Sequence, residues 1–489
     1  MDIKGKVLET IDYLKSKGAT YGDIRFVRTE TESLRVRDLA VDSIVRDTTQ
    51  GFGIRVIADG AWGFAATSTV SAGALRKAAT RALQIARASA LSRREPVQLA
   101  EAEPVQASWR SPCVTDPFDV KLGRKLDMLL QVNEVLKQKP EIRVAESSLA
   151  FYRTHKLFAS SEGSLVEQDI VESGGGFVAT AADGTDVQRR SFPSPSGDFG
   201  TGGFEIIEGM GLREHAEQTR EEAIALLTAP PMPAGRFDVV IGSSQVALQV
   251  HESCGHPVEL DRALGTEISL AGASFLTTDR LGSFRYGSPL VTITADATVP
   301  GALGTFGFDD EGVPAQRAPI IDRGIFVGYL TSRETARVLG QRSNGAMRAD
   351  GWASIPLIRM TNVNLEPGSA TLDELLADTD GGYCVDSNKS WSIDDHRLNF
   401  QFGLEIAWKI EGGRKGRIYK NPVYTGMTPA FWGSCDAICG RQNWHVWGVP
   451  NCGKGEPMQT ARVGHGAAPA RFRALEVGSA RQPAEGGNA

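Results

Sequence analysis

The sequence predicts an α+β protein with two domains, and three observations lead to that fold class. The chain has 489 residues, which is more than one hydrophobic core usually holds. Its 54 glycines separate many short segments in which apolar and polar residues alternate, as in antiparallel strands. A proline-rich stretch at residues 230–235 is stiff and extended, so it is the expected boundary between the domains.

The first domain, residues 1–229, is predicted to be a mixed α/β domain with an antiparallel sheet. Helices are expected where apolar residues recur every three to four positions, over residues 5–17, 71–90, 120–137 and 212–227. Strands are expected where apolar and polar residues alternate, over residues 24–27, 33–36, 53–57, 62–65 and within 143–187.

The second domain, residues 236–477, is predicted to be β-rich and to carry the metal-binding helix. An apolar strand over 237–241 leads through a turn, in which Ser243 or Ser244 can cap the next helix, into a helix over 245–256. Further strands are expected over 290–293, 325–329, 400–405 and 416–420, and short helices over 332–339 and 371–377. The tail, residues 478–489, is predicted to be disordered.

Composition and charge narrow the classes of function. The net charge of −6 and the lack of a long basic run argue against nucleic acid as a partner. No apolar stretch approaches the roughly 20 residues that span a bilayer, and the N-terminus lacks the apolar core of a signal peptide. Six scattered cysteines fit a reduced environment better than a disulfide framework, so a cytoplasmic protein is expected.

The six residues from His251 to His256 contain two imidazoles and one carboxylate, that of Glu252. Two histidines can supply neutral nitrogen ligands to Zn²⁺, and a glutamate beside them can activate a metal-bound water. The common zinc-protease motif places its histidines four residues apart, whereas here they are five apart. Two unrelated histidines near a helix end remain an equally weighted reading of these residues taken alone.

The unusual spacing predicts a distorted helix. Five residues on a regular α-helix separate two side chains by about 140° of rotation, which does not suit two ligands of one ion. A local widening to i→i+5 hydrogen bonds would bring His251 and His256 to one side, and such π-bulges occur mostly at functional sites. Pro257 has no N–H to donate to the carbonyl of Ser253, so the regular ladder is interrupted there in any case.

A catalytic zinc typically has three protein ligands and one open position. The candidates for the third ligand are Glu259, Asp261, His396, His445, His465 and the cysteines. Cys452 stands out because it lies in the glycine-rich turn N-C-G-K-G-E, where Lys454 could stabilise a thiolate. From this segment alone, a small buried thiol in a loop is an equally weighted reading.

The other cysteines near these segments are weaker candidates. Cys435 and Cys439 are four residues apart and could also chelate, although packing is the preferred reading. Cys254 lies between the two histidines but on another side of the helix.

The motif His251-Glu252-x-x-x-His256 followed by Glu259 resembles that of the TldD/PmbA family of zinc metalloproteases, in its TldD-like, catalytic branch. Four other segments resemble further family signatures: G-F-G-I-R-V at 51–56, F-D-D-E-G-V-P at 308–314, R-M-T-N at 359–362 with E-P-G at 366–368, and N-C-G-K at 451–454. The resemblance covers nearly the whole chain.

The resemblance implies a site, a reaction and partners. His251, His256 and Cys452 would bind Zn²⁺, and Glu252 would take a proton from the zinc-bound water that attacks a peptide bond. The thiolate would make this site less electrophilic than one with three neutral histidines. The expected substrates are unfolded or extended peptides, hydrolysed in a chamber formed by a homodimer or by a heterodimer with a PmbA-like subunit.

Two other functions stay open from the sequence. The chain could be a non-catalytic peptide-binding or assembly subunit that keeps a structural metal, or a metal-dependent amidase that acts on a small non-peptide substrate. Asp309, Asp310 and Glu311 could orient a ligand imidazole, although a solvated turn is the preferred reading. Arg359 could bind a peptide carboxylate or form a structural salt bridge.

Overall fold

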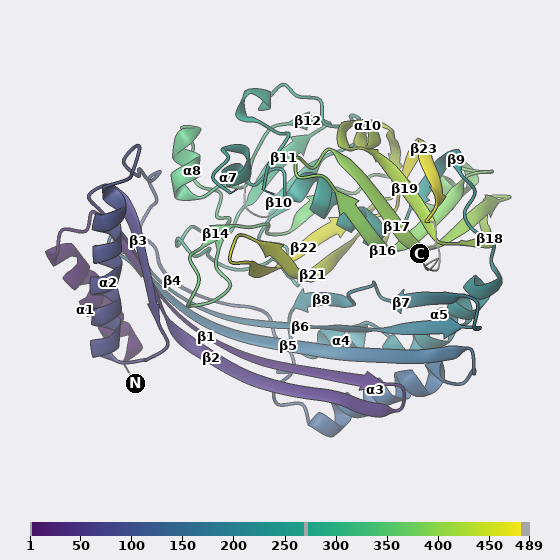
Figure 1. Cartoon of the computed structure of the whole chain (residues 1–489), viewed down its shortest axis with the longest axis horizontal. Coiled ribbons are helices and arrows are strands. Elements are labelled where there is room, and N and C mark those ends of the chain that lie inside the picture. The colour runs from purple at the N-terminus through teal and green to yellow at the C-terminus, as the bar shows by residue number, and fades with distance from the viewer. Residues whose placement is uncertain (1, 268–271, 481–489) are drawn as a thin grey trace, which may run out of the picture.

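Long antiparallel strands build the N-terminal half of the chain. The computed structural model describes residues 2–267 and 272–480, and it confirms the predicted α+β class. At the centre of an eight-stranded sheet lie β2 (Ala40–Ala58), β1 (Tyr21–Arg37), β5 (Ile142–Ser160) and β6 (Leu165–Ala182), in that order. Figure 1 shows these strands as a long curved layer beneath the C-terminal half.

Shorter strands complete this sheet. β3 (Ala61–Thr67) pairs with β2, whereas β4 (Gln106–Arg110), β7 (Val187–Phe192) and β8 (Asp198–Thr201) all pair with β6. Only β4 runs parallel to its neighbour among these pairs.

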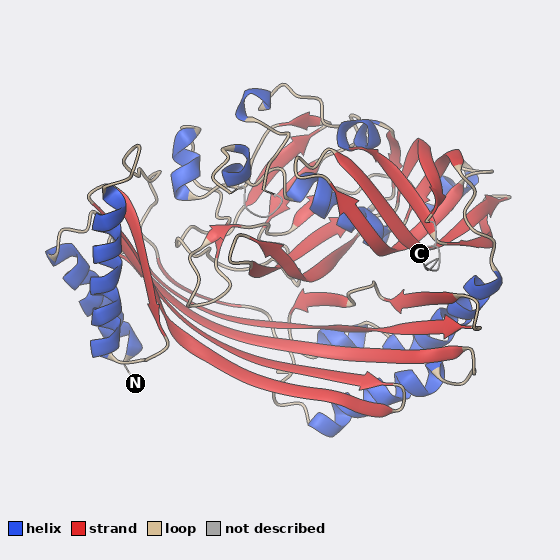
Figure 2. Cartoon of the chain, viewed as in Figure 1, coloured by secondary structure: helices blue, strands red, loops and turns tan. Residues whose placement is uncertain are grey.

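Helices, drawn in blue in Figure 2, pack at both ends of the sheet. They enclose two apolar cores. α1 (Ile3–Ser16) and α2 (Ala72–Ala90) cover the end that carries β3, and the hydroxyl of Ser71 caps α2. α3 (Leu122–Leu136), α4 (Glu205–Gly209) and α5 (Leu212–Thr228) cover the other end of β1, β5 and β6. All four helices predicted in this half are therefore present, within a few residues of their expected bounds.

The strands predicted from the sequence for this sheet are shorter and more numerous than those in the structure. The segments expected at 24–27 and 33–36 are one strand, β1, and residues 28–32 between them pair with both β2 and β5. Neighbouring backbones hold this polar stretch in the sheet, so alternation of apolar residues could not detect it.

A closed ring of strands forms the centre of the C-terminal half. Its members are β9 (Gly235–Ile241), β23 (Ala470–Ser479), β19 (Pro422–Met427), β17 (Asn399–Glu411) and β16 (Tyr383–Ile393), and β16 closes the ring by pairing with β9. β18 (Arg414–Lys420) pairs with β17, and β20 (Cys435–Ile438) pairs with β23.

Smaller sheets and short helices surround the ring. One sheet contains β10 (Ile293–Asp296), β11 (Arg317–Asp322), β12 (Ile325–Phe326) and β15 (Val363–Leu365). Two hairpins are formed by β13 (Met347–Arg348) with β14 (Leu357–Ile358) and by β21 (His445–Lys454) with β22 (Gln459–Ala467). The helices are α6 (Ser243–Val250), α7 (Leu260–Ala263), α8 (Arg333–Val338), α9 (Leu372–Ala377) and α10 (Thr428–Gly433).

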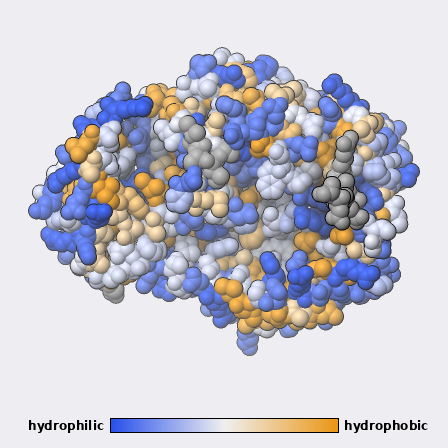
Figure 3. All heavy atoms as spheres, viewed as in Figure 1, coloured by the Kyte–Doolittle hydropathy of each residue, from blue (hydrophilic) through white to orange (hydrophobic). Residues whose placement is uncertain are grey.

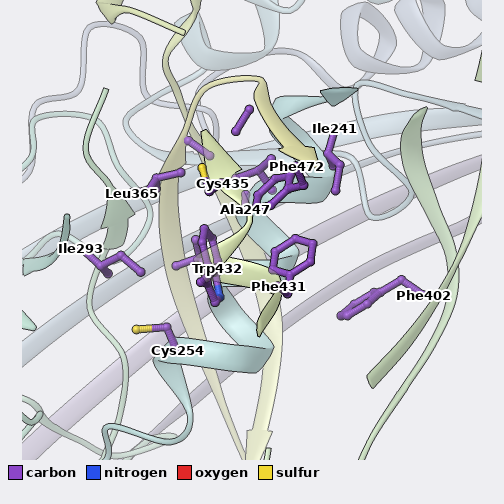
Figure 4. Close-up of a cluster of buried hydrophobic side chains, with 14 of the residues drawn as sticks. Ile241, Ala247, Cys254, Ile293, Leu365, Phe402, Phe431, Trp432, Cys435 and Phe472 are labelled. Carbon is purple, nitrogen blue, oxygen red and sulfur yellow. The ribbon is translucent and has the colours of Figure 1, made fainter. Parts of the chain in front are cut away.

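The largest apolar core of the molecule surrounds α6 and the ring. Figure 4 shows part of this core, where Phe431, Trp432 and Phe472 pack together close to Ala247 of α6. Cys254 points into the same core, and burial raises the pKa of its thiol to about 12. Cys254 is therefore a packing residue rather than a rival metal ligand.

On the face shown in Figure 3, hydrophilic side chains cover much of the surface and apolar ones form separate groups. No helix within residues 2–267 and 272–480 is long and apolar enough to cross a membrane. Of the tail predicted to be disordered, residues 478–489, Gly478 and Ser479 belong to β23 and residues 481–489 lie outside the described part of the chain.

Candidate metal centre

His251, His256 and Cys452 come together in the interior of the C-terminal half, and all three are buried. The Sγ of Cys452 lies 3.3 Å from the Nε2 of His251 and 3.7 Å from the Nε2 of His256. Zinc bonds of about 2.3 Å to sulfur and about 2.0 Å to nitrogen place these atoms about 3.5 Å apart in a tetrahedral site. The two sulfur–nitrogen distances fit this geometry, and all three donor atoms lie within 4.8 Å of one another, so the cluster could hold a metal ion.

A π-helical turn, His251–Gly255, follows α6 and accommodates the five-residue spacing. The N–H of His256 donates to the carbonyl of His251 at 3.2 Å, which is an i→i+5 bond. The widened turn that the spacing predicted is confirmed.

Two aromatic residues hold Ser253, whose carbonyl Pro257 leaves without its helical partner. The hydroxyl of Tyr286 donates to the carbonyl of Ser253 at 2.9 Å, in place of the N–H that Pro257 lacks. The indole of Trp432 donates to the hydroxyl of Ser253 at 2.9 Å. The distortion is thus built into the surrounding core.

A chain of hydrogen bonds fixes the tautomer of His251. His465 uses Nδ1 to donate to the carbonyl of Val363 at 3.0 Å, so its Nε2 must be an acceptor when the ring is neutral. That Nε2 lies 2.7 Å from the Nδ1 of His251, which must therefore carry the proton. The Nε2 of His251 is left with a free lone pair facing Cys452.

Glu259 plays the corresponding part for His256. Its Oε2 accepts from the Nδ1 of His256 at 3.1 Å and from Arg262 at 2.7 Å. Burial opposes the charge of this carboxylate, but Lys454 and Arg262 outweigh burial and hold the pKa of Glu259 well below its usual range. His256 also presents its Nε2 lone pair to the cluster. Burial lowers the pKa of both His251 and His256, which keeps them neutral.

The cation beside the Cys452 thiol is Arg359. Burial raises the pKa of this thiol, but the charge of Arg359 and the contact with His256 outweigh burial, so the pKa falls below its usual value. Arg359 is buried, and it donates to the carbonyls of Cys452 and Gln459 rather than to a carboxylate. Lys454, expected to stabilise the thiolate, instead donates to both oxygens of Asp261 at 2.8 Å, so that prediction was wrong.

Glu252 is bonded to Arg397, a residue that the sequence did not single out. The Nη1 of Arg397 lies 2.7 Å from the Oε2 of Glu252, and both side chains are buried. Arg397 lies in the turn between β16 and β17 with a φ of 65°, a conformation that costs a non-glycine residue free energy. The carboxylate of Asp394 stabilises this turn by accepting from the N–H groups of Leu398 and Asn399.

The cluster opens onto a cavity of about 690 Å³. The cavity is lined by His251, Glu252, His256 and Cys452, and by Arg397. The remaining walls come from β16, β21, α6, β7 and the segment between β7 and β8. Its volume lies within the range usual for small-molecule pockets.

The other candidates for the third ligand do not join the cluster. His465 and Glu259 bond to the far sides of the two histidines, and Asp261 pairs with Lys454. His396 is exposed, and His445 pairs with Asp198 at 2.6 Å. Four of the remaining cysteines are buried elsewhere or exposed: Cys113, Cys384, Cys435 and Cys439.

Asp309, Asp310 and Glu311 form neither a solvated turn nor a shell around the histidines, so both expectations were wrong. All three are buried between the two halves of the molecule. Asp310 bonds to Lys156 of β5 at 3.1 Å, and Glu311 bonds to Arg55 of β2 at 3.3 Å. This acidic turn links the C-terminal half to the long sheet.

The capping prediction for α6 was also wrong. The residue before this helix is Gly242, and no side chain caps the helix. The hydroxyl of Ser244 instead donates to Asp386 at 2.9 Å.

A buried His-His-Cys cluster with a glutamate in its cavity defines the class of site found in metal-dependent hydrolases. Family models for PmbA/TldA metallopeptidases match this chain in three parts: domain 1 at residues 22–86, the central domain at 115–227 and the C-terminal domain at 234–479. The chain belongs to the PmbA/TldD metallopeptidase family, as its motifs predicted.

Relatives and solved structures agree with this assignment. A metalloprotease of Methanothermobacter thermautotrophicus is 30% identical over 458 residues, which cover 94% of this chain and 95% of that protein. A protein of Saccharolobus solfataricus named zinc metalloprotease TldD homolog is 23% identical over 94% of this chain and 97% of its own length.

Two crystal structures share the fold. One from Thermotoga maritima has a TM-score of 0.77 at 18% identity and covers 97% of this chain and 99% of that chain. TldE from Thermococcus kodakarensis has a TM-score of 0.70 at 16% identity and covers 96% of this chain and 99% of its own.

Proposed function

We propose that this chain is a zinc-dependent peptidase that hydrolyses unfolded or extended peptides. The observation that carries the proposal is the convergence of His251, His256 and Cys452, with Glu252, on one cavity. Zinc held by the three side chains would supply a Lewis acid that polarises a carbonyl and makes water a nucleophile at neutral pH. This chemistry, and zinc as the metal, are proposals for this chain.

Glu252 would be the general base. Arg397 occupies its Oε2, so Oε1 is the oxygen available to take a proton from the attacking water. The same oxygen could return that proton to the leaving nitrogen of the peptide. Arg397 would act as a positioning residue, because it holds the carboxylate in one orientation.

The charges around the site are arranged in opposite pairs. They are Glu252 with Arg397, Glu259 with Arg262, Asp261 with Lys454, and the Cys452 thiolate with Arg359. Arg359 therefore offsets the charge of the thiolate ligand. A thiolate ligand by itself would make the bound zinc less electrophilic, and the charge of Arg359 would reduce this loss.

Two strand edges in the cavity support an extended peptide as the substrate. β16 pairs with β9 only over Tyr383–Val385, and most of its residues 388–393 line the cavity. β21 also lines the cavity and pairs with β22 on one side. Within the described residues, neither segment has a partner strand on its other side, so each offers backbone groups to an incoming peptide strand.

A dimer with an internal chamber is part of the proposal. Residues 40–50 of β2 pair with β1 on one side, but β3 pairs with β2 only from Phe52 onward, so in the described part of the chain their outer side has no partner strand. Leu39, Val41, Ile44 and Val45 beside this edge are 42–58% exposed. An exposed apolar edge is a template for pairing with a second chain, identical or PmbA-like. A strict monomer in light scattering would exclude the chamber.

Comparison of the zinc-loaded protein with its Glu252→Gln variant tests the function. Wild type should hydrolyse an unfolded peptide, and Glu252→Gln should keep its zinc while losing about 10²- to 10⁴-fold in kcat. Glu9→Gln, at an exposed position in α1, is the matched control and should behave as wild type.

Other outcomes would identify the alternatives. Zinc without hydrolysis of any amide would indicate a binding subunit with a structural metal. Hydrolysis of small amides alone would indicate an amidase. Full activity in Glu252→Gln would contradict the proposed role of this residue. The cytoplasmic location stays a prediction from the sequence.

A further inference from the structure

Two cations line the metal-site cavity from opposite halves of the molecule. Arg189 belongs to β7 of the long sheet, and Lys389 belongs to β16 of the ring. Both positions depend on how the halves pack together. Neither residue contacts the metal cluster through a bond described above, so the mechanism leaves them without a role.

The charge of Lys389 is not matched by a carboxylate. Its Nζ donates to the side-chain oxygen of Asn421 at 2.9 Å, which is a neutral group. Within residues 2–267 and 272–480, no carboxylate oxygen lies within the 4.0 Å of Nζ that defines an ion pair. The side chain is only partly exposed, so water compensates its charge incompletely.

Arg189 shares the carboxylate of Glu405 with other residues. Its Nε lies 3.2 Å from Glu405, but Glu405 also binds Arg190 at 3.1 Å and the hydroxyl of Ser191 at 3.0 Å. Glu405 thus already links the two halves through Arg190 and Ser191. Arg189 and Lys389 are not needed for that link, which argues against a purely structural role.

The two cations also act on one another. Burial lowers the pKa of Lys389, and the charge of Arg189 lowers it further, whereas Glu405 and Asp186 oppose this shift. Two neighbouring positive charges that destabilise each other would be stabilised by an anion placed between them. Apolar side chains also line the cavity, with Trp391, Ile393 and Trp447 among them.

We propose that Arg189 and Lys389 form a carboxylate subsite, which selects peptides that carry an acidic side chain or a free C-terminal carboxylate. This inference rests on the proposed peptidase function, because it assumes that peptides enter the cavity. It assigns the enzyme a preference for acidic peptides, a substrate class that the metal cluster alone does not specify.

The test measures binding separately from hydrolysis. The peptides are fluorescein-labelled, consist of alternating Ala and Thr, and have an amidated C-terminus. In one series a single Glu is placed at each position in turn. In the matched series Gln replaces that Glu. A further pair has no acidic residue and ends in a free or an amidated C-terminus. Binding to the zinc-loaded Glu252→Gln protein is followed by fluorescence anisotropy, so no catalysis is required.

For at least one position, the Glu peptide should bind about five- to tenfold more tightly than its Gln counterpart. Lys389→Met and Arg189→Gln, each made in the Glu252→Gln protein, should abolish this difference without weakening the Gln peptide, and Lys389→Arg should retain it. The preference should also shrink when salt rises from about 0.05 M to about 0.5 M. Lys139→Met, an exposed lysine outside the cavity, is the control and should change nothing.

Each result either identifies the source of the carboxylate or contradicts the subsite. A preference only for the free C-terminus identifies a terminal carboxylate, and a preference for an internal Glu identifies a side chain. Equal binding of charged and neutral peptides, no binding of any peptide, or a preference that survives both substitutions in properly folded variants overturns the subsite. Preferential binding without hydrolysis by wild type would contradict the peptidase proposal but would still support the subsite.

Discussion

The Nδ1 of His251 lies 2.7 Å from the Nε2 of His465, and this contact aims the other nitrogen of His251 at Cys452. His465 was a candidate ligand by sequence, but it holds a ligand instead. Its own orientation is set by the carbonyl of Val363, so a backbone group ultimately chooses the tautomer at the cluster.

Replacing His465 with Phe should therefore weaken zinc binding about 10- to 100-fold, although His465 would touch no metal. The imidazole of His251 would lose its acceptor and rotate more freely. Competition with a chelator gives the zinc affinity, and a melting curve of the metal-free protein reports whether the core tolerates the ring. An unchanged affinity would show that the contact does not orient His251.

Cys452→Ser should abolish stoichiometric zinc, since a neutral hydroxyl is a poor replacement for a thiolate ligand. Cys254→Ser is the matched control, because that thiol lies two residues from Glu252 but points into the apolar core. Elemental analysis after dialysis should find zinc in the control and not in Cys452→Ser. Equal zinc in both variants would remove Cys452 from the site.

Arg397→Met should lower kcat about 10- to 100-fold with little change in KM, because Glu252 would lose the partner that fixes Oε2. Arg397→Lys keeps the charge and should recover part of the activity. Zinc content should stay the same in both variants. A loss confined to KM would show that Arg397 contacts substrate rather than positions Glu252.

The buried acidic turn predicts how stability changes with pH. Burial and the charge of Glu311 raise the pKa of Asp309 to about 8, against about 3.9 in an unfolded chain. Between these values the folded protein keeps a proton that the unfolded chain has lost, so this group makes stability fall as pH rises from about 4 to about 8.

Asp309→Asn cannot ionise and should show a smaller fall of Tm over that range than wild type. Asp322→Asn, at a position 53% exposed, is the control and should follow wild type. Parallel curves for wild type and Asp309→Asn would mean that Asp309 is ionised throughout.

Local patterns were enough to predict much of this molecule. The apolar spacing of α2 and the hydroxyl of Ser71 at its start both act within a few residues, so the helix was readable from the chain. The spacing of His251 and His256, together with Pro257, likewise predicted the widened helical turn.

Contacts between residues far apart in the sequence could not be predicted from such local patterns. Glu252 and Arg397 are 145 positions apart, and nothing in the D-D-H-R sequence around Arg397 indicates that its side chain reaches the cluster. The run Asp309-Asp310-Glu311 looks solvated, because its cationic partners Arg55 and Lys156 belong to strands far earlier in the chain. Charge in a sequence does not show whether a partner will bury it.

His251 and Cys452 supply the first and the last of the three donor atoms along the chain, and they are 201 positions apart. Nearly all of the C-terminal half must therefore be synthesised and folded before the donor set exists. A ribosome-bound chain that has exposed His251 and Glu252 still lacks its third donor, and a fragment truncated before residue 452 would lack it permanently. The order of the ligands along the chain thus delays assembly of the metal centre until the walls of its cavity have been made.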